Sequence, residues 1–403
     1  MILSVSIPVH LWFNFYMLAG VYIHIPFCRS RCSYCDFATD VYKNQETVER
    51  YVNALCGEIS NFKFQIPDSR FQIPDSRFQI DTVYFGGGTP SLLLPEQLEK
   101  ILKIIHEFFS VDKNTEITME MNPATVSLET LKEYRNLGVN RASFGAQTFD
   151  DTELKRLGRR HTAKDVRETI ELLRKADFQN VSFDLIAGLP RQTLEDWERN
   201  LDEALKLKPE HLSLYLLEIH EGTPLAEQIR SGRQPLPDED LAARMYELML
   251  EKVWAKGYRQ YEISNFSLPG YESRHNLKYW QFAPYYSFGV SAHSFDGRNR
   301  RWANERDTLA YVRKIENNLS SVTETTELDE KMRRAEYTFL GLRLNEGVDL
   351  KEFQKIFGTN LLEEFSVEFE RLQEADLIEF DKNNLRLTRK GMLYSNEVFR
   401  VFV

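Results

Sequence analysis

The sequence is poor in cysteine and has no excess of basic residues: 403 residues include four Cys, and 51 Lys and Arg stand against 61 Asp and Glu. The net charge of −10 argues against a nucleic-acid partner. Residues 1–16 carry no acid, Lys or Arg, but they are too short and too interrupted to span a membrane. They also lack the basic start and the small-residue cleavage site of a secretory signal. We therefore expect a cytoplasmic protein with no integral membrane segment, and sparse cysteine fits a reducing compartment.

Two stretches do not fit an ordinary globular pattern. Met17 stands just ahead of the first strand-like run, so we expect translation to start at this residue. We interpret residues 1–16 as a segment wrongly included in the sequence or as a disordered one. A seven-residue unit is repeated without change at 64–70 and 71–77. Its proline forbids a continuous helix, and we interpret the repeat as a duplication that lengthens a surface loop.

Three of the four cysteines lie within eight residues, at Cys28, Cys32 and Cys35. Disulfides need a particular separation of two backbones, which such close spacing does not favour. Structural zinc takes four ligands, and the nearest candidates for a fourth, His24 and Cys56, are poorly placed. Three thiolates suit a [4Fe–4S] cluster with one iron left open. The alternative at this point is three inert or zinc-bound cysteines.

Strand-like and helix-like segments alternate along the first 220 residues. The alternation predicts parallel strands joined by crossover helices. One face of each strand is apolar and the other is polar, so we expect an open (β/α)6 barrel with a polar ligand at the carboxyl ends of its strands. The expected strands are 21–26, 81–85, 116–122, 141–147, 181–188 and 211–219, and the expected helices are 46–62, 95–109, 127–137, 162–176 and 193–207.

Polar and glycine-rich motifs follow these strands. A glycine-rich run directly after a strand lets the backbone approach a ligand closely, and here it is Gly86-Gly87-Gly88-Thr89-Pro90. An ordinary strand-to-loop turn without a ligand would explain the same sequence. A second set lies on or just after the inward faces, and burying it is costly unless it meets a polar partner. A self-satisfying hydrogen-bond network is the alternative explanation. The members of this set are Glu120, Gln147, Arg159 and Asp184.

The CxxxCxxC spacing resembles the signature of the radical S-adenosylmethionine (SAM) superfamily. Five further motifs narrow the resemblance to the oxygen-independent coproporphyrinogen III oxidase group: YIHIPFCRSRCSYCDF, YFGGGTPS, EMNP, SFGAQTF with LGRRH, and FDLIAGLPRQT, all within residues 22–193. The resemblance implies a partial TIM barrel with a cluster on Cys28, Cys32 and Cys35. It places the SAM contacts on Tyr22, Gly87, Gly88, Thr89, Glu120, Gln147, Arg159 and Asp184.

Two features bear on the subfamily. The decarboxylating oxidases have a fourth cysteine two places after the third, where this chain has Phe37. The chain instead resembles the HemW-type haem chaperones, which combine CxxxCxxCxF with an HNxxYW motif, here residues 275–280. That resemblance implies haem binding and transfer to an acceptor protein, with cluster and SAM in a structural or regulatory role. His275 is then the candidate haem ligand, with His293 as a competitor, and oxidase activity on coproporphyrinogen III is the alternative.

The remaining features complete the predicted organisation. We expect a core barrel at 17–250, a connecting region at 251–325 and a winged-helix-like domain at 326–403 that caps the barrel or docks the haem acceptor. Its expected helices are 329–344, 350–357 and 361–375, followed by a strand pair at 377–380 and 385–388. Three interpretations are open for Arg29 and Arg31. They neutralise the negative charge of the cluster, they bind an acidic electron donor, or they are ordinary charged residues of a solvated loop. Cys56 is expected to face the core.

Overall fold

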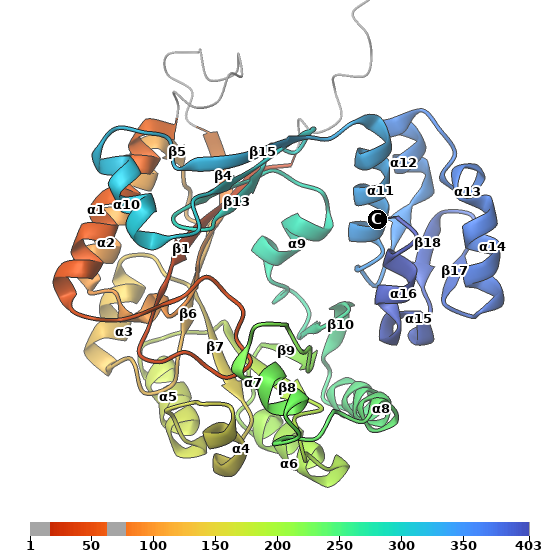
Figure 1. Ribbon diagram of the computed structural model, residues 1–403, viewed down its shortest axis with the longest axis horizontal. Coiled ribbons are helices and arrows are strands. Elements are labelled where there is room, and N and C mark those ends of the chain that lie inside the picture. Colours follow the sequence, from red (N-terminus) through yellow and green to blue (C-terminus); the bar gives the residue numbers. More distant parts are fainter. Residues whose placement is uncertain (1–16, 63–77, 403) are drawn as a thin grey trace, which may run out of the picture.

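The computed structural model of the chain describes residues 17–62 and 78–402 (Figure 1). The N-terminal segment 1–16 and the repeat units at 64–77 lie outside the described residues, so the interpretations given to them stay predictions. No helix in the described ranges is both long and apolar enough to cross a membrane.

Six parallel strands form the centre of the sheet and are neighbours in chain order. Helices lie between successive strands on the outside of the curved sheet (Figure 1). This arrangement confirms the predicted open (β/α)6 barrel. The strands are β1 (Ala19–Ile25), β4 (Phe78–Gly87), β6 (Glu116–Met121), β7 (Arg141–Gln147), β8 (Val181–Ala187) and β9 (His211–Leu216). The helices between them are α1 (Gln45–Asn61), α2 (Pro95–Phe108), α3 (Leu128–Asn136), α5 (Ala163–Lys175) and α6 (Leu194–Lys206).

The predicted alternation of strand faces is confirmed. Ile23, Val83 and Phe183, all on the apolar parity, are completely buried under the helices. The opposite parity carries the polar side chains that face the inside of the barrel. Two buried layers therefore meet at this sheet: an apolar layer outside and a polar layer inside that requires partners.

The sheet extends beyond the barrel at both edges. On one edge, β12 (Tyr285–Phe288) pairs in parallel with β1, followed by antiparallel β13 (His293–Phe295), β14 (Arg300–Asn304) and β15 (Val322–Glu327). On the other edge, β11 (Asn265–Ser267) pairs with β9, and β10 (Arg259–Glu262) pairs with β11. The region predicted as a connection thus continues the same sheet. Four of these strands have only three or four residues, and the longer β14 and β15 contain few apolar residues, so none shows a clear period-two pattern.

Short elements complete this part of the chain. All of them except the 17-residue α8 have two to nine residues, which is too short to show a clear periodicity in the sequence. They are β2 (Phe27–Cys28), β3 (Asp40–Val41), the 3₁₀ helix η4 (Pro90–Leu92), β5 (Phe109–Ser110), α4 (Asp151–Arg156), α7 (Pro224–Arg230), α8 (Glu239–Ala255), α9 (Arg274–Trp280) and α10 (Thr308–Glu316).

The C-terminal region is a small helical unit with a three-stranded sheet in the order β16-β18-β17, drawn in blue in Figure 1. It has the winged-helix-like character expected. The single helix expected at 361–375 is wrong, because the backbone leaves helical geometry at Phe365 (φ −117°, ψ 29°). The elements are α11 (Glu330–Gly341), β16 (Val348–Asp349), α12 (Leu350–Phe357), α13 (Leu361–Glu364), α14 (Ser366–Glu374), β17 (Ile378–Phe380), β18 (Asn384–Leu387), α15 (Arg389–Leu393) and α16 (Ser395–Phe399).

A buried carboxylate joins the first helix to the sheet extension. Glu58 of α1 is only 3% exposed. One of its oxygens accepts from Gly289 N (2.8 Å) and Tyr311 Oη (2.6 Å). The other accepts from Asn304 Nδ2 (2.6 Å) and Ser321 Oγ (2.8 Å). Burial raises the pKa of Glu58, and the four donors counteract that rise.

We expect Glu58→Gln to lower the free energy of unfolding by about 2–5 kcal/mol, because an amide replaces one acceptor by a donor and leaves two buried donors unpaired. Urea denaturation followed by circular dichroism measures the change. Glu46→Gln, at an exposed position of the same helix, is the matched control and should change stability by no more than about 0.5 kcal/mol. Equal urea midpoints for the two variants would contradict the conclusion that Glu58 stabilises the contact between α1 and the sheet extension.

Candidate functional site

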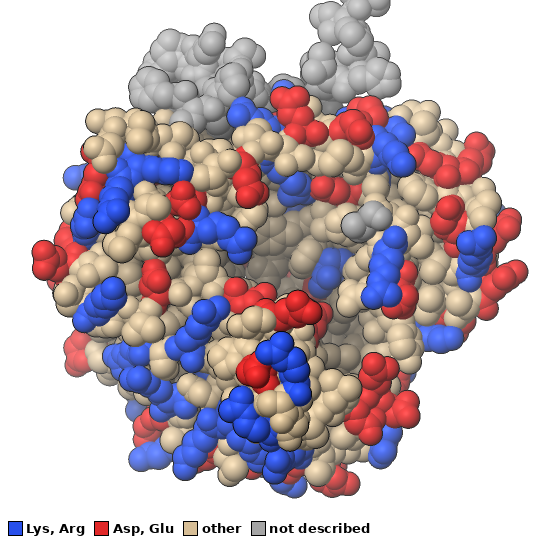
Figure 2. All heavy atoms as spheres, viewed as in Figure 1, with Lys and Arg blue, Asp and Glu red and all other residues tan. Residues whose placement is uncertain are grey.

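A cleft of about 1030 Å³ opens at the carboxyl ends of the parallel strands. The cysteine loop, the strand ends, the loop after β9, and helix α8 line it, and residues 392–397 of the C-terminal unit form part of its wall. Figure 2 shows this face of the molecule hollowed between the barrel and the C-terminal helices. Its volume lies at the upper end of the roughly 300–1,000 Å³ of ordinary small-molecule pockets.

The three clustered cysteines all lie on this cleft and are partly exposed. Their loop is fastened to the barrel through Ser33, whose N–H donates to Leu157 O and whose carbonyl accepts from Leu225 N, both at 2.8 Å. Burial raises the pKa of the Cys28 thiol to about 11 and also raises that of Cys35. Cys56 is buried in the core, as expected.

The surroundings of the sulfurs fit thiolate ligands of a cluster. Among the described residues, no three His, Cys, Asp or Glu side chains converge as a single metal ion requires. A [4Fe–4S] cluster differs, since each cysteine binds a different iron. Two sulfurs have donors aimed at them: Thr89 Oγ1 lies 3.6 Å from Cys28 Sγ, and Arg159 Nη1 lies 3.6 Å from Cys32 Sγ. A hydroxyl and a guanidinium both favour the negatively charged sulfur that iron requires.

Glu120 ties the glycine-rich turn to the sheet. Its carboxylate accepts from Tyr84 Oη (2.8 Å) and from Gly87 N (3.1 Å). Burial, together with the nearby Asp184, raises the pKa of Glu120 to about 7. Gly87 has φ +109°, which favours glycine, and a Cβ on Gly88 would stand 2.6 Å from Pro26 O. The glycines therefore let this turn lie directly against the end of β1.

Arg159 is the centre of a hydrogen-bond network beside the cysteines. Its Nη2 donates to Asn122 Oδ1 (2.7 Å) and Gly145 O (2.6 Å). Asn122 Nδ2 in turn donates to Thr89 Oγ1 at 2.7 Å. Asn122 was not among the predicted site residues. Its sequence signal was its position two residues after Glu120, on the same polar face of the strand.

Gln147 and Asp184 complete the wall of the cleft. Gln147 has φ +66° at a bulge between β7 and β8, an uncommon conformation for a residue other than glycine. Such strain is often retained where it directs a functional side chain. Burial raises the pKa of Asp184, while a hydrogen bond with Ser213 and the nearby Arg141 act in the opposite direction.

Six of the eight predicted SAM-contacting residues line the cleft, and two do not. Tyr22 lies behind the wall, where its hydroxyl is 3.2 Å from His24 Nδ1 and its ring stacks on Tyr84. Thr89 is buried and reaches the cleft only through its bonds to Cys28 and Asn122. Thr89 therefore contacts cleft residues directly, whereas Tyr22 is linked to the cleft only through Tyr84, which donates to Glu120.

His275 lies deep in the barrel and does not line the cleft. It is 1% exposed, with Nδ1 2.8 Å from Thr82 Oγ1 and Nε2 3.0 Å from Tyr279 Oη. Burial lowers the pKa of His275 to about 3, so the ring is neutral. Its ligation of haem stays a prediction, and in this arrangement ligation would require the Tyr279 or Thr82 contact to break.

The other candidates lie elsewhere. His293 is exposed on β13, outside the cleft lining. The ring of Trp280 stacks on Arg343, whose guanidinium carbon lies 4.1 Å from the ring centroid and which does line the cleft. The HNxxYW motif therefore approaches the cleft through its tryptophan and not through its histidine.

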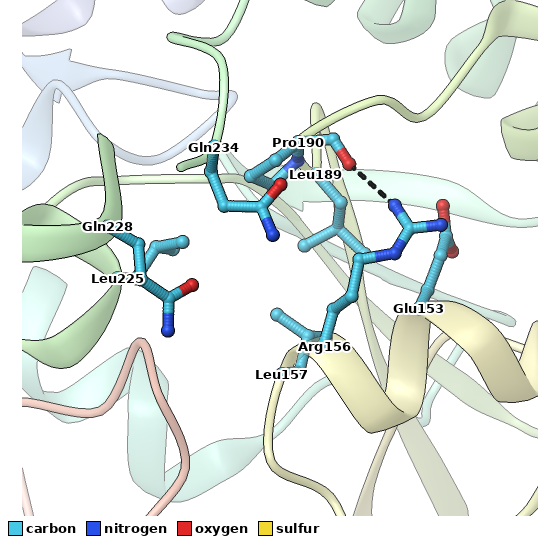
Figure 3. Close-up of a pocket in the computed structure, with 8 residues that line it drawn as sticks. All are labelled: Glu153, Arg156, Leu157, Leu189, Pro190, Leu225, Gln228 and Gln234. Carbon is cyan, nitrogen blue, oxygen red and sulfur yellow. Dashed lines mark hydrogen bonds between the residues drawn. The ribbon is translucent and has the colours of Figure 1, made fainter. Parts of the chain in front are cut away.

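A second, small cavity lies between α4 and α7 (Figure 3). Its volume of about 10 Å³ has room for one water at most. Arg156 Nη1 donates to Pro190 O at 3.0 Å on one side, and Gln228 and Gln234 lie opposite. This cavity does not compete with the cleft as a ligand site.

Similarity to known proteins covers nearly the whole chain. A model of the radical SAM superfamily matches residues 22–204, and one of the HemN C-terminal domain matches residues 328–394. The haem chaperone HemW of Bacillus subtilis is 38% identical over 96% of this chain and 99% of its own length. HemW of Lactococcus lactis is 35% identical over 95% and 97%. The structure of coproporphyrinogen III oxidase (HemN) from Escherichia coli aligns with a TM-score of 0.81 at 21% identity, covering 96% of this chain and 90% of that one, which shows the shared fold.

We expect Arg159→Lys to lower the free energy of unfolding by about 1–3 kcal/mol even without iron, because one ammonium cannot replace the guanidinium fork toward Asn122, Gly145 and Cys32. After anaerobic reconstitution, its iron–sulfur absorption should also decay faster in air. Urea denaturation and the absorption time course provide the two measurements. The exposed neighbour Arg160→Lys serves as control; indistinguishable behaviour of the two variants would rule out the network.

Proposed function

Because the chain belongs to the HemW family of haem chaperones, within the radical SAM superfamily, we propose that it binds haem and passes it to an acceptor protein. The observation that carries this proposal is the full-length similarity to HemW proteins. Coproporphyrinogen III oxidase activity, the alternative drawn from the sequence, is not favoured by the names of these relatives. Phe37, at the place of the oxidases' fourth cysteine, agrees with that choice.

Membership of the superfamily implies a [4Fe–4S] cluster and SAM. We assign the cluster to Cys28, Cys32 and Cys35, and the SAM contacts to Tyr22, Gly87, Gly88, Thr89, Glu120, Gln147, Arg159 and Asp184. The donors toward Cys28 and Cys32 support the first assignment. Bound SAM and cluster have a structural or regulatory role in this proposal.

The electrostatics of the cleft suit a zwitterion with ribose hydroxyls. Arg159 is a fixed cation that pairs with a carboxylate. Burial raises the pKa of Glu120 to about 7, so its carboxyl group is only partly ionised at neutral pH. A cationic group placed beside it would favour the ionised form and gain an ion pair. Asp184 offers acceptors to hydroxyl groups on the same wall.

The size of the cleft leaves room for cargo beside the cofactor. Residues 392–397 place the C-terminal unit across part of the opening, which supports a capping role for that unit. Arg29 and Arg31 are exposed beside the cluster loop and suit an acidic electron donor.

The test uses reconstituted full-length protein loaded with ferric haem and mixed with an apo-haemoprotein. We expect haem to move to the acceptor, as measured by the acceptor's absorption spectrum after separation. The Cys28→Ala, Cys32→Ala, Cys35→Ala triple variant shows whether the cluster is needed. Conversion of coproporphyrinogen III to protoporphyrinogen in the presence of SAM and reductant, without transfer, would overturn the proposal in favour of the oxidase.

A further inference from the structure

The histidines in the described ranges differ sharply in their access to the cleft. Only His220 lines it. His106 and His293 are exposed on other parts of the surface. The buried histidines are His24, His161, His211 and His275. An axial imidazole for haem iron must present a free nitrogen to the haem. Exposure of the ring to the cleft is therefore the first criterion for choosing among these histidines.

His220 is held in place by the loop that follows β9. Leu217 N donates to Ala187 O at 2.9 Å, which continues the pairing of β9 with β8. Thr223 Oγ1 donates to the carbonyl of His220 at 2.7 Å. The next helix, α7, begins against the cysteine loop through the bond from Leu225 N to Ser33 O. The backbone of His220 is thus fixed relative to the cluster loop.

The imidazole of His220 has the environment typical of a metal-binding ring. Its Nδ1 lies 3.5 Å from Asp36 Oδ2, in the cysteine loop. Histidines that bind metals usually donate their second ring N–H to a carboxylate, and Asp36 lies within ion-pair distance on the side of the ring that would donate. The Nε2 atom has Glu218 Oε2 at 3.8 Å and makes no hydrogen bond to the described residues. The ring is 42% exposed, in contrast to that of His275.

Exposed apolar side chains line the same cleft as this imidazole. Phe37 is 64% exposed and Leu236 is 72% exposed, and both line the cleft together with Ile219 and Tyr215. Single exposed apolar side chains are ordinary, but a group of them around one cleft indicates a binding surface for an apolar molecule. Phe37 follows Asp36 directly, so the residue in place of the oxidases' fourth cysteine adds to this surface.

A cation on the cleft suits the acidic edge of a porphyrin. Arg343 lines the cleft, and its Nε is buried without a hydrogen-bond partner among the described residues. Its Nη2 lies 3.3 Å from Glu262 Oε2, and Trp280 supports its flat face. A guanidinium held this way is prepared to bind a carboxylate such as a porphyrin propionate.

We infer that this cleft binds haem with the Nε2 of His220 on the iron, with Asp36 holding the Nδ1 proton, and with Phe37, Ile219 and Leu236 against the macrocycle. The inference rests on the proposed function and assigns its cargo site. The neutral imidazole donates its Nε2 lone pair to the iron, the proton stays on Nδ1, and no electron is transferred. His275, with both nitrogens engaged, is a structural residue of the barrel in this assignment.

The experiment titrates ferric haem into the full-length, anaerobically reconstituted protein and records the Soret band and the electron paramagnetic resonance spectrum. We expect His220→Ala to lose the histidine-ligated spectrum and to bind haem at least tenfold more weakly, about 1.4 kcal/mol. Affinity for iron-free protoporphyrin, measured by fluorescence, should be equal in the two proteins. His220→Gly should regain the spectrum when imidazole is added. His106→Ala, on an exposed helix position away from the cleft, is the matched control.

The outcomes separate the two proposals. An unchanged spectrum and affinity in His220→Ala, or loss of the histidine-ligated spectrum in His275→Ala or His293→Ala alone, overturns the assignment while leaving haem binding intact. Failure of the wild-type protein to bind haem at all overturns the proposed function and the inference together. The iron–sulfur absorption of each variant reports whether it has folded. If His220→Ala does not fold, the imidazole rescue of His220→Gly tests the ligand assignment instead.

Discussion

The guanidinium of Arg159 joins the two halves of the candidate site. It reaches Cys32 Sγ on one side and Asn122 and the carbonyl of Gly145 on the other. Through Asn122 the same network continues to Thr89 and then to Cys28. A loop of three cysteines has no hydrophobic core of its own, so it needs such contacts to stay in one place. The polar inner face of the barrel provides them.

This polar face is also what makes the barrel open to ligands. A sheet filled on both sides by aliphatic side chains would close into a packed core. Here Glu120 and Asp184 occupy the inner face, and burial raises the pKa of both. The strain in the backbone of Gln147 lies at the same edge. The sheet extension and the C-terminal unit then widen the opening into a cleft, so that cofactor and cargo are proposed to share one space.

Much of this arrangement follows from local patterns in the chain. The alternation along β6 predicted that Glu120 faces inward, and the six strands appear in the predicted order. Asn122 was missed as a site residue because an amide two places further along a strand is compatible with many roles. The strands β10–β13 were missed because three or four residues show no clear period. The longer β14 and β15 were missed because they contain few apolar residues to alternate with polar ones. The break at Phe365 was missed because the helical pattern continues across it.

The three thiols and their spacing, the glycine turn and the order of the strands could all be predicted, because each depends on residues close together in the chain. Which histidine is open to a ligand could be seen only in the folded protein. The sequence pointed to His275 and His293 and did not single out His220. In the fold, the His275 ring is enclosed by Thr82 and Tyr279, while the His220 ring faces the cleft beside Asp36. Access of that kind depends on which distant segments pack over a side chain, and no local pattern encodes it.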